Sequence, residues 1–177
     1  NATAALIDFG HVVSVAIVIR SALFWVATEG WHGIPIVIAA FAIGSIAMLL
    51  ISQYRVQLFK RTNRSGDCLQ QAVIDGNLAV GIRYAGFLVG SALALTAASG
   101  IAPYAADNIV ASLGYWALSA AVSLVAFILL HLVTIKIILS GCDISDEVNR
   151  QKNVGVAAIS AAISFAIGST MATLLGA

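Results

Sequence analysis

The sequence predicts an all-α membrane protein, a polytopic bundle of transmembrane helices. Of its 177 residues, 60% are hydrophobic and only 10% are charged, whereas an average soluble domain has about 25% charged residues. The mean hydropathy is +0.99, and several apolar runs reach the roughly 20 residues that a helix needs to cross a bilayer. This composition excludes a soluble globular domain, a disordered chain and a basic nucleic-acid-binding domain, so nucleic acid is not expected among the partners.

The first hydrophobic segment runs from Gly10 to Ala27 and is long enough for roughly 27 Å of helix. It lacks the broad charged face of a helix that lies in the membrane surface, so we favour an additional span. Arg20 then lies at membrane depth, which costs about 3 kcal/mol unless the side chain reaches the interface or another helix. The Gly- and Pro-containing sequence between Glu29 and Pro35 is typical of a tight turn. We therefore assign residues 1–33 to an N-terminal hydrophobic helix and hairpin turn.

Four further segments are continuous apolar runs of spanning length. The third of them, Ile109–Leu139, is longer than a bilayer requires, so it is expected to tilt or to project beyond the membrane. The four predicted spans are Ile34–Tyr54, Leu78–Ala98, Ile109–Leu139 and Val154–Leu175.

The basic residues predict the orientation. The loop after Tyr54 holds Arg55, Lys60, Arg61 and Arg64, and the loop before Val154 holds Lys136, Arg150 and Lys152. These are seven of the nine Lys and Arg residues, and the connections at residues 28–35 and 99–108 have none. By the positive-inside rule the basic loops are cytoplasmic and the C-terminus faces outward. Basic side chains beside a membrane attract anionic headgroups or an acidic partner. The candidate contacts for lipid or a partner are Lys60, Arg61, Arg64, His131 and Lys136, and the last two are expected to snorkel at the interface.

An offset of 76 residues superposes Asp67 on Asp143 and Asn77 on Asn153. The same offset superposes Lys60 on Lys136 and Arg55 on His131. We predict two parallel two-helix repeats, residues 34–108 and residues 109–177. Two spans per repeat give both copies the same orientation, unlike the inverted repeats of many secondary transporters.

Small residues predict where helices pack. Gly86, Gly90 and Ala94 recur every four residues, and the offset of 76 places Ala162 and Ala166 at the positions equivalent to the two glycines. Such stripes let helix backbones approach closely in a membrane. We expect Gly86 and Gly90 to pack on the helix that carries Ala162 and Ala166, and self-association between copies is the alternative.

Asn77 and Asn153 precede two spans and are expected to cap them or to form interhelical hydrogen bonds. In the alternative they line a polar pathway together with Arg83, which is close enough to a helix end to snorkel. No nucleophile elbow, zinc-protease motif or phosphate-binding loop is present, and two cysteines are too few for a disulfide scaffold. We therefore expect no enzyme activity and no catalytic, cofactor or metal site.

Two segments, NLAVGIRYAGFLVG beginning at Asn77 and NVGVAAISAA beginning at Asn153, carry a family resemblance. They resemble the duplicated N-x-A-x-A…G-x-x-x-G signature of YjfL-like bacterial inner-membrane proteins, known as domain of unknown function 350. The resemblance covers residues 34–177 and departs at Gly155, where an Ala is expected, and at Ala162 and Ala166, which replace the glycine pair. It implies four spans in a bacterial inner membrane and no established activity.

Together these features predict an integral inner-membrane structural or accessory subunit. We expect it to form a homo-oligomer or to join a membrane complex, and to contact membrane lipids or a partner through its basic loops. The alternative is a small ion or solute channel or transporter built from parallel repeats. A dry interior of Ala and Gly favours the first function, whereas polar residues along a continuous cavity favour the second.

Overall fold

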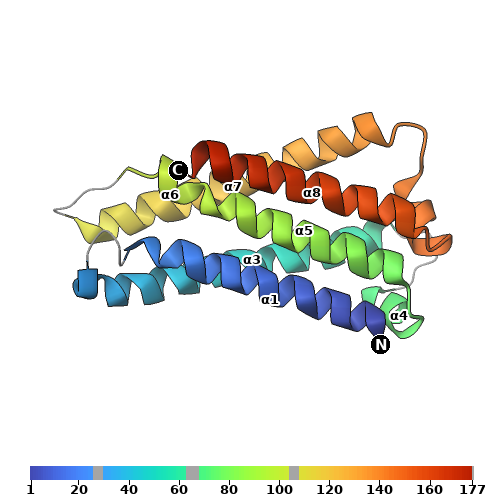
Figure 1. Ribbon diagram of the computed structural model, residues 1–177, viewed down its shortest axis with the longest axis horizontal. Coiled ribbons are helices and arrows are strands. Elements are labelled where there is room, and N and C mark those ends of the chain that lie inside the picture. Colours follow the sequence, from blue (N-terminus) through green and yellow to red (C-terminus); the bar gives the residue numbers. More distant parts are fainter. Residues whose placement is uncertain (26–29, 63–67, 104–107, 177) are drawn as a thin grey trace.

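The computed structural model describes residues 1–25, 30–62, 68–103 and 108–176. Five long helices run side by side along its length (Figure 1). They are α1 (Ala2–Ala22), α3 (Ile34–Thr62), α5 (Leu78–Thr96), α7 (Ile109–Ile138) and α8 (Val154–Leu175). The short helices are η1 (Gly30–Gly33), α4 (Leu69–Ile74), α6 (Ala98–Ile101) and η2 (Asp146–Arg150). The described ranges contain no strand, which confirms the predicted all-α transmembrane bundle.

All five long helices are apolar and long enough to cross a membrane, so the chain is a multi-pass membrane protein. The first helix begins earlier than predicted, at Ala2 instead of Gly10, and ends at Ala22. The sequence before Gly10 is rich in Ala and Leu, which favour helix, and the Asn1 side chain caps it by accepting from Thr3 N. Asp8 interrupts the apolar run but lies on the exposed side of this helix. Residues 26 and 27 of the predicted segment lie outside the described residues.

The helix α3 continues for two turns beyond the predicted end at Tyr54 and stops at Thr62. Residues 55–62 contain neither Gly nor Pro, so nothing in the sequence breaks the helix at the membrane boundary. The prediction that placed Arg55, Lys60 and Arg61 in a loop is therefore wrong, since all three lie on α3.

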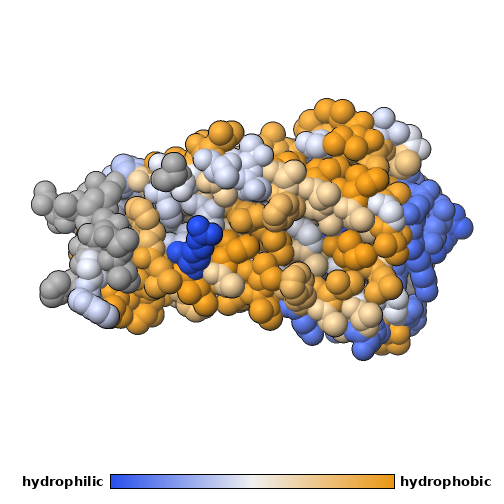
Figure 2. Space-filling view, in the orientation of Figure 1, coloured by the Kyte–Doolittle hydropathy of each residue, from blue (hydrophilic) through white to orange (hydrophobic). Residues whose placement is uncertain are grey.

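One end of the bundle gathers the hydrophilic residues. Figure 1 places the N-terminus, α4, η2 and the final turns of α3 and α7 there, with the C-terminus and α6 at the opposite end. Figure 2 shows hydrophilic residues at this same end and mainly hydrophobic ones along the sides. A hydrogen bond and the negative charge of Asp146 raise the pKa of Arg150, which stays charged. We call this end the basic end, and its exposed basic residues are Lys60, Arg61, Lys136, Arg150 and Lys152.

The helix α5 is the most buried of the five and lies between α1 and α8. A methyl group added at Gly10 of α1 would lie 2.7 Å from the Cα atom of Ala85, so the two backbones are in close contact. On the side of α8 there is equally little space, because Gly86 faces Ala161 and Gly90 faces the Ser164 backbone. Close packing of this kind takes the place of hydrophobic attraction between helices in lipid.

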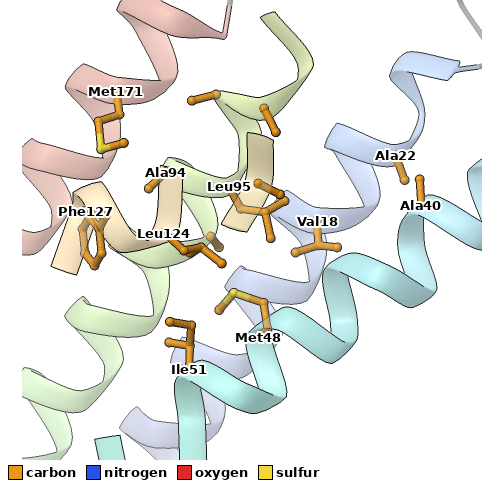
Figure 3. Close-up of a cluster of buried hydrophobic side chains, with 14 of the residues drawn as sticks. Val18, Ala22, Ala40, Met48, Ile51, Ala94, Leu95, Leu124, Phe127 and Met171 are labelled. Carbon is orange, nitrogen blue, oxygen red and sulfur yellow. The ribbon is translucent and has the colours of Figure 1, made fainter. Parts of the chain in front are cut away.

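Apolar side chains from all five long helices fill the centre of the bundle (Figure 3). Val18 of α1, Met48 of α3 and Leu95 of α5 meet there with Leu124 of α7, and Met171 of α8 belongs to the same cluster. The largest fully buried side chain is that of Trp116 on α7. The centre is therefore a packed apolar layer, and the charged residues that enter the bundle do so near its ends.

Candidate functional site

Two arginine side chains enter the bundle near the basic end, where α3 faces α5. Arg55 lies on α3 and Arg83 lies on α5, and both line one cavity of about 200 Å³. The helix α4 and the segment just before η2 complete the lining. The remaining lining residues are Leu58, Phe59, Thr62, Leu69, Val80, Tyr84 and Ser145.

Arg55 is buried because it continues the inward-facing stripe of α3. The buried residues of that helix recur every three or four positions and are Ile36, Ala40, Gly44, Met48, Ile51 and Arg55. The Arg55 side chain is only 9% exposed, and its Cζ atom lies 4.4 Å from the centroid of the Phe87 ring. Such a cation–π contact contributes about 2 kcal/mol when the pair is desolvated, which offsets part of the cost of burying the charge.

Neither guanidinium has an internal counter-charge among the described residues. The Nε atoms of Arg55 and Arg83 are buried and have no hydrogen-bond partner there, and no described Asp or Glu lies within ion-pair distance of either arginine. Tyr84 lies beside Arg83 in the lining, and its hydroxyl is 2.6 Å from Ser52 Oγ. Among the described residues, the cavity is thus lined by two positive charges and by no carboxylate.

His131 extends this polar region toward α7. Its side chain is 3% exposed, and its ring meets Phe87 edge-on with 5.1 Å between the ring centroids. The Ser164 hydroxyl donates to the Ser160 carbonyl, so it accepts a hydrogen bond from His131 Nδ1 at 3.1 Å. The expectation that His131 snorkels at the interface is wrong, because it lies on the buried stripe of α7 and has its polar partner inside the bundle.

Asn77 and Asn153, the two asparagines expected to cap helices, both lie at a helix start. The Asn77 side chain accepts from Val80 N at the start of α5, and Asn153 accepts from Val156 N at the start of α8. Asn77 is 2% exposed and also donates to the carbonyls of Val148 and Asn149. It therefore ties the start of α5 to η2. Neither asparagine lines the arginine cavity.

The predicted contact between α5 and α8 exists, but with different residues on α8. Ala162 and Ala166 are exposed, whereas Gly86 faces Ala161, and Gly90 packs against the Ser164 backbone and against Gly168. The reason is that a sequence offset pairs positions that need not face each other, and one residue along a helix rotates a side chain by about 100°. Ala94 is fully buried on α5.

The other predicted contacts for lipid or a partner lie at the surface. Lys60 and Arg61 are exposed in the last turn of α3, and Lys136 is exposed in the last turn of α7. Arg64 lies outside the described residues. Sequence reasoning did not identify Arg55 as a site residue, although its place on the four-residue stripe of α3 was a usable signal.

A second polar hollow, of about 400 Å³, lies toward the opposite end between α1, α5 and α8. Arg20 belongs to its lining together with the hydroxyl residues Ser21, Thr96, Ser99 and Ser169. The Arg20 side chain is exposed at the surface of the bundle, whereas that of Arg55 is buried. Within the described part of the chain, no three His, Cys, Asp or Glu side chains lie close enough together to hold a metal ion.

The apolar helices and the arginine cavity define a multi-pass α-helical membrane protein with a basic polar site near one end. Comparison with family models places residues 30–175 in the family described as Domain of Unknown Function (DUF350). The match covers most of the chain, so the protein belongs to this family, and α1 lies before the matched region. No curated protein and no solved structure matched the chain.

Proposed function

We propose that the protein is a structural or accessory subunit of the bacterial inner membrane. In this proposal the basic end is cytoplasmic, the C-terminus faces outward, and the basic end binds anionic lipid headgroups or an acidic partner. The observation that carries the proposal is the packed apolar layer that separates the two polar hollows.

The separation can be followed along α5. Tyr84 belongs to the arginine cavity and Leu93 to the opposite hollow, so about 13 Å of helix lies between them. Within that stretch Phe87, Leu88 and Ala92 are at most 2% exposed. Ser91 is buried there as well, and its hydroxyl donates to the Phe87 carbonyl one turn earlier. A continuous conduit would need polar groups facing a shared space, so this packing favours a scaffold over the channel alternative.

The proposal includes a homo-oligomer. An open apolar hollow of about 320 Å³ lies on the bundle between α3 and α7. Small residues line much of it, including Gly44, Ala47, Ala117 and Ala121, and small residues favour close helix approach in membranes. Native mass spectrometry from lipid nanodiscs tests this part, and a single copy at all protein concentrations would contradict it.

The experiment for anion binding compares the parent with the triple variant Lys60→Glu, Arg61→Glu, Arg64→Glu. Both are tested for binding to vesicles of phosphatidylglycerol and of phosphatidylcholine. We expect the parent to bind the anionic vesicles, and the reversal to abolish that binding, because each basic residue near the surface contributes about 1 kcal/mol. A thermal melt and a topology assay of the variant are the controls, since charge reversal can invert orientation.

The same preparations test the channel alternative. Proteoliposomes of the parent should show no ion or solute flux above that of empty liposomes. A flux that disappears in the variant Asn77→Leu, Asn153→Leu, while that variant still folds, would contradict the scaffold function.

A further inference from the structure

We propose that Arg55 and Arg83 form a binding site for a phosphate-bearing anion, either the headgroup of an anionic phospholipid or free phosphate. This inference rests on the proposed function and deepens it, because it gives the anion-binding end a defined internal site. The exposed lysines and arginines of the basic end are not part of this site.

The first argument is charge. A guanidinium stays protonated in proteins, so both arginines bring a full positive charge into the bundle. Lys60 and Arg61 reach water from the surface, but Arg55 is nine-tenths buried and its Nε has no partner among the described residues. Buried charges in proteins are normally paired, and the described residues supply no carboxylate to this pair. An external anion would supply the missing charge.

The second argument is the chemistry of the donors. The guanidinium is a planar fork that matches the oxygens of a phosphate two at a time. The Phe87 ring contacts Arg55 and holds its guanidinium in place. Arg83 and the hydroxyl-bearing Tyr84 line the same cavity from α5, so donors from two helices converge on it.

The third argument is size and depth. The cavity of about 200 Å³ is smaller than the roughly 300–1,000 Å³ of pockets for drug-sized ligands, and it suits a compact headgroup. Arg83 lies five residues after Leu78 and Arg55 seven before Thr62, so both lie about 8–11 Å from a helix end. Both arginines therefore lie in the outer part of their helices and not at the bundle centre, and basic pockets between transmembrane helices are known to bind phosphorylated headgroups. Leu58, Phe59 and Leu69 add apolar walls that suit the start of an acyl chain.

The test uses the purified full chain in a neutral detergent. Its thermal midpoint is measured during titration with phosphatidylglycerol, with phosphatidylcholine and with inorganic phosphate. The variants are Arg55→Gln and Arg83→Gln, and Arg20→Gln is the matched control because it removes the same charge from an exposed position on α1, away from the basic end. Arg55→Lys keeps the charge but removes the fork.

We expect phosphatidylglycerol to raise the midpoint of the parent and of Arg20→Gln. The apparent affinity should fall about tenfold or more in Arg55→Gln and Arg83→Gln, and by a smaller factor in Arg55→Lys, since hydrogen bonds to charged groups are the strong ones. A response to phosphatidylglycerol alone identifies a lipid ligand, and an equal response to inorganic phosphate identifies the free anion. Without anion, Arg55→Gln should be at least as stable as the parent, because it removes an unpaired buried charge.

The proposal is overturned if neither anion raises the midpoint, if both arginine variants respond like the parent, or if anion-free Arg55→Gln melts far below the parent. Failure of the proposed function gives a different pattern. In that case the triple reversal at Lys60, Arg61 and Arg64 leaves binding to anionic vesicles unchanged, whatever the response of the arginine variants.

Discussion

The Cζ atom of Arg55 lies 4.4 Å from the centroid of the Phe87 ring, which places a cation of α3 against an aromatic side chain of α5. The His131 ring meets the same phenyl ring from α7. Arg55 and His131 are one of the residue pairs that the 76-residue offset superposes. Two positions that the offset superposes therefore both contact one side chain, that of Phe87.

This contact predicts energetic coupling between Arg55 and Phe87. In a double-mutant cycle with Arg55→Met and Phe87→Leu, we expect a coupling free energy of about 1–2 kcal/mol, because the pair is desolvated. Unfolding in mixed micelles measures the four free energies. Additive effects, within about 0.5 kcal/mol, would mean that the two side chains do not interact.

The glycines of α5 predict a clear difference among Gly-to-Ala substitutions. A methyl group at Gly86 would overlap Ala161, and one at Gly90 would overlap the Ser164 backbone, so each substitution should lower the free energy of unfolding by about 2–3 kcal/mol. Gly114 of α7 is the matched control, because a methyl group there meets no atom within 4 Å.

Gly114→Ala should be neutral or should stabilise by up to about 1 kcal/mol through helix propensity. Thermal melts of the three single variants in detergent make the comparison. Equal midpoints for Gly86→Ala, Gly90→Ala and Gly114→Ala would show that α5 and α8 are not in close contact.

The two N-caps predict unequal costs for Asn-to-Ala substitution. Asn77→Ala removes a cap and two hydrogen bonds to the carbonyls of Val148 and Asn149, so we expect a loss of about 2–4 kcal/mol. Asn153→Ala removes a cap and a hydrogen bond to Glu147 in a less buried place, so a loss of about 1 kcal/mol is expected. The free energies of unfolding of the two variants test this difference. A larger loss for Asn153→Ala would contradict the larger structural role that we assign to Asn77.

The proposed orientation predicts the reactivity of the two thiols. Cys68 at the start of α4 and Cys142 between α7 and η2 are both free thiols, and both lie at the basic end. A membrane-impermeant maleimide should miss both in intact cells and label both in inside-out vesicles, with Cys142 faster because it is exposed. Labelling of one cysteine from each side would contradict the placement of both at one end.

The sequence was sufficient to predict the bounds of a helix where its apolar run begins or ends at a capping residue. Val154–Leu175 was predicted with the bounds that the structure has, because Asn153 caps its start. Gly10–Ala27 was misplaced because Asp8 interrupts the apolar run, yet a charged residue near a helix end is tolerated on an exposed side.

The buried positions of Arg55 and His131 were harder to predict, because positive charge near a membrane boundary normally indicates a loop or a snorkelling side chain. The sequence indicates Arg83 as a candidate, but it places Arg55 in a loop and His131 at the interface. The spacing that buries them was present in the sequence: Ile51 precedes Arg55 by four residues, and Phe127 precedes His131 by four. Which helix covers that stripe depends on tertiary packing, and the 76-residue sequence offset does not contain this information.

The position of α5 between α1 and α8 has a consequence for the order of assembly. The helix α8 begins 76 residues after α5, so at about 5–20 residues per second the ribosome needs about 4–15 s to reach it. During that interval α5 can already dock on α1, but Gly86 and Gly90 still face lipid. The helix that is most buried in the finished bundle is therefore half-covered during synthesis, and its glycine face is the surface on which a wrong neighbour could dock before α8 arrives.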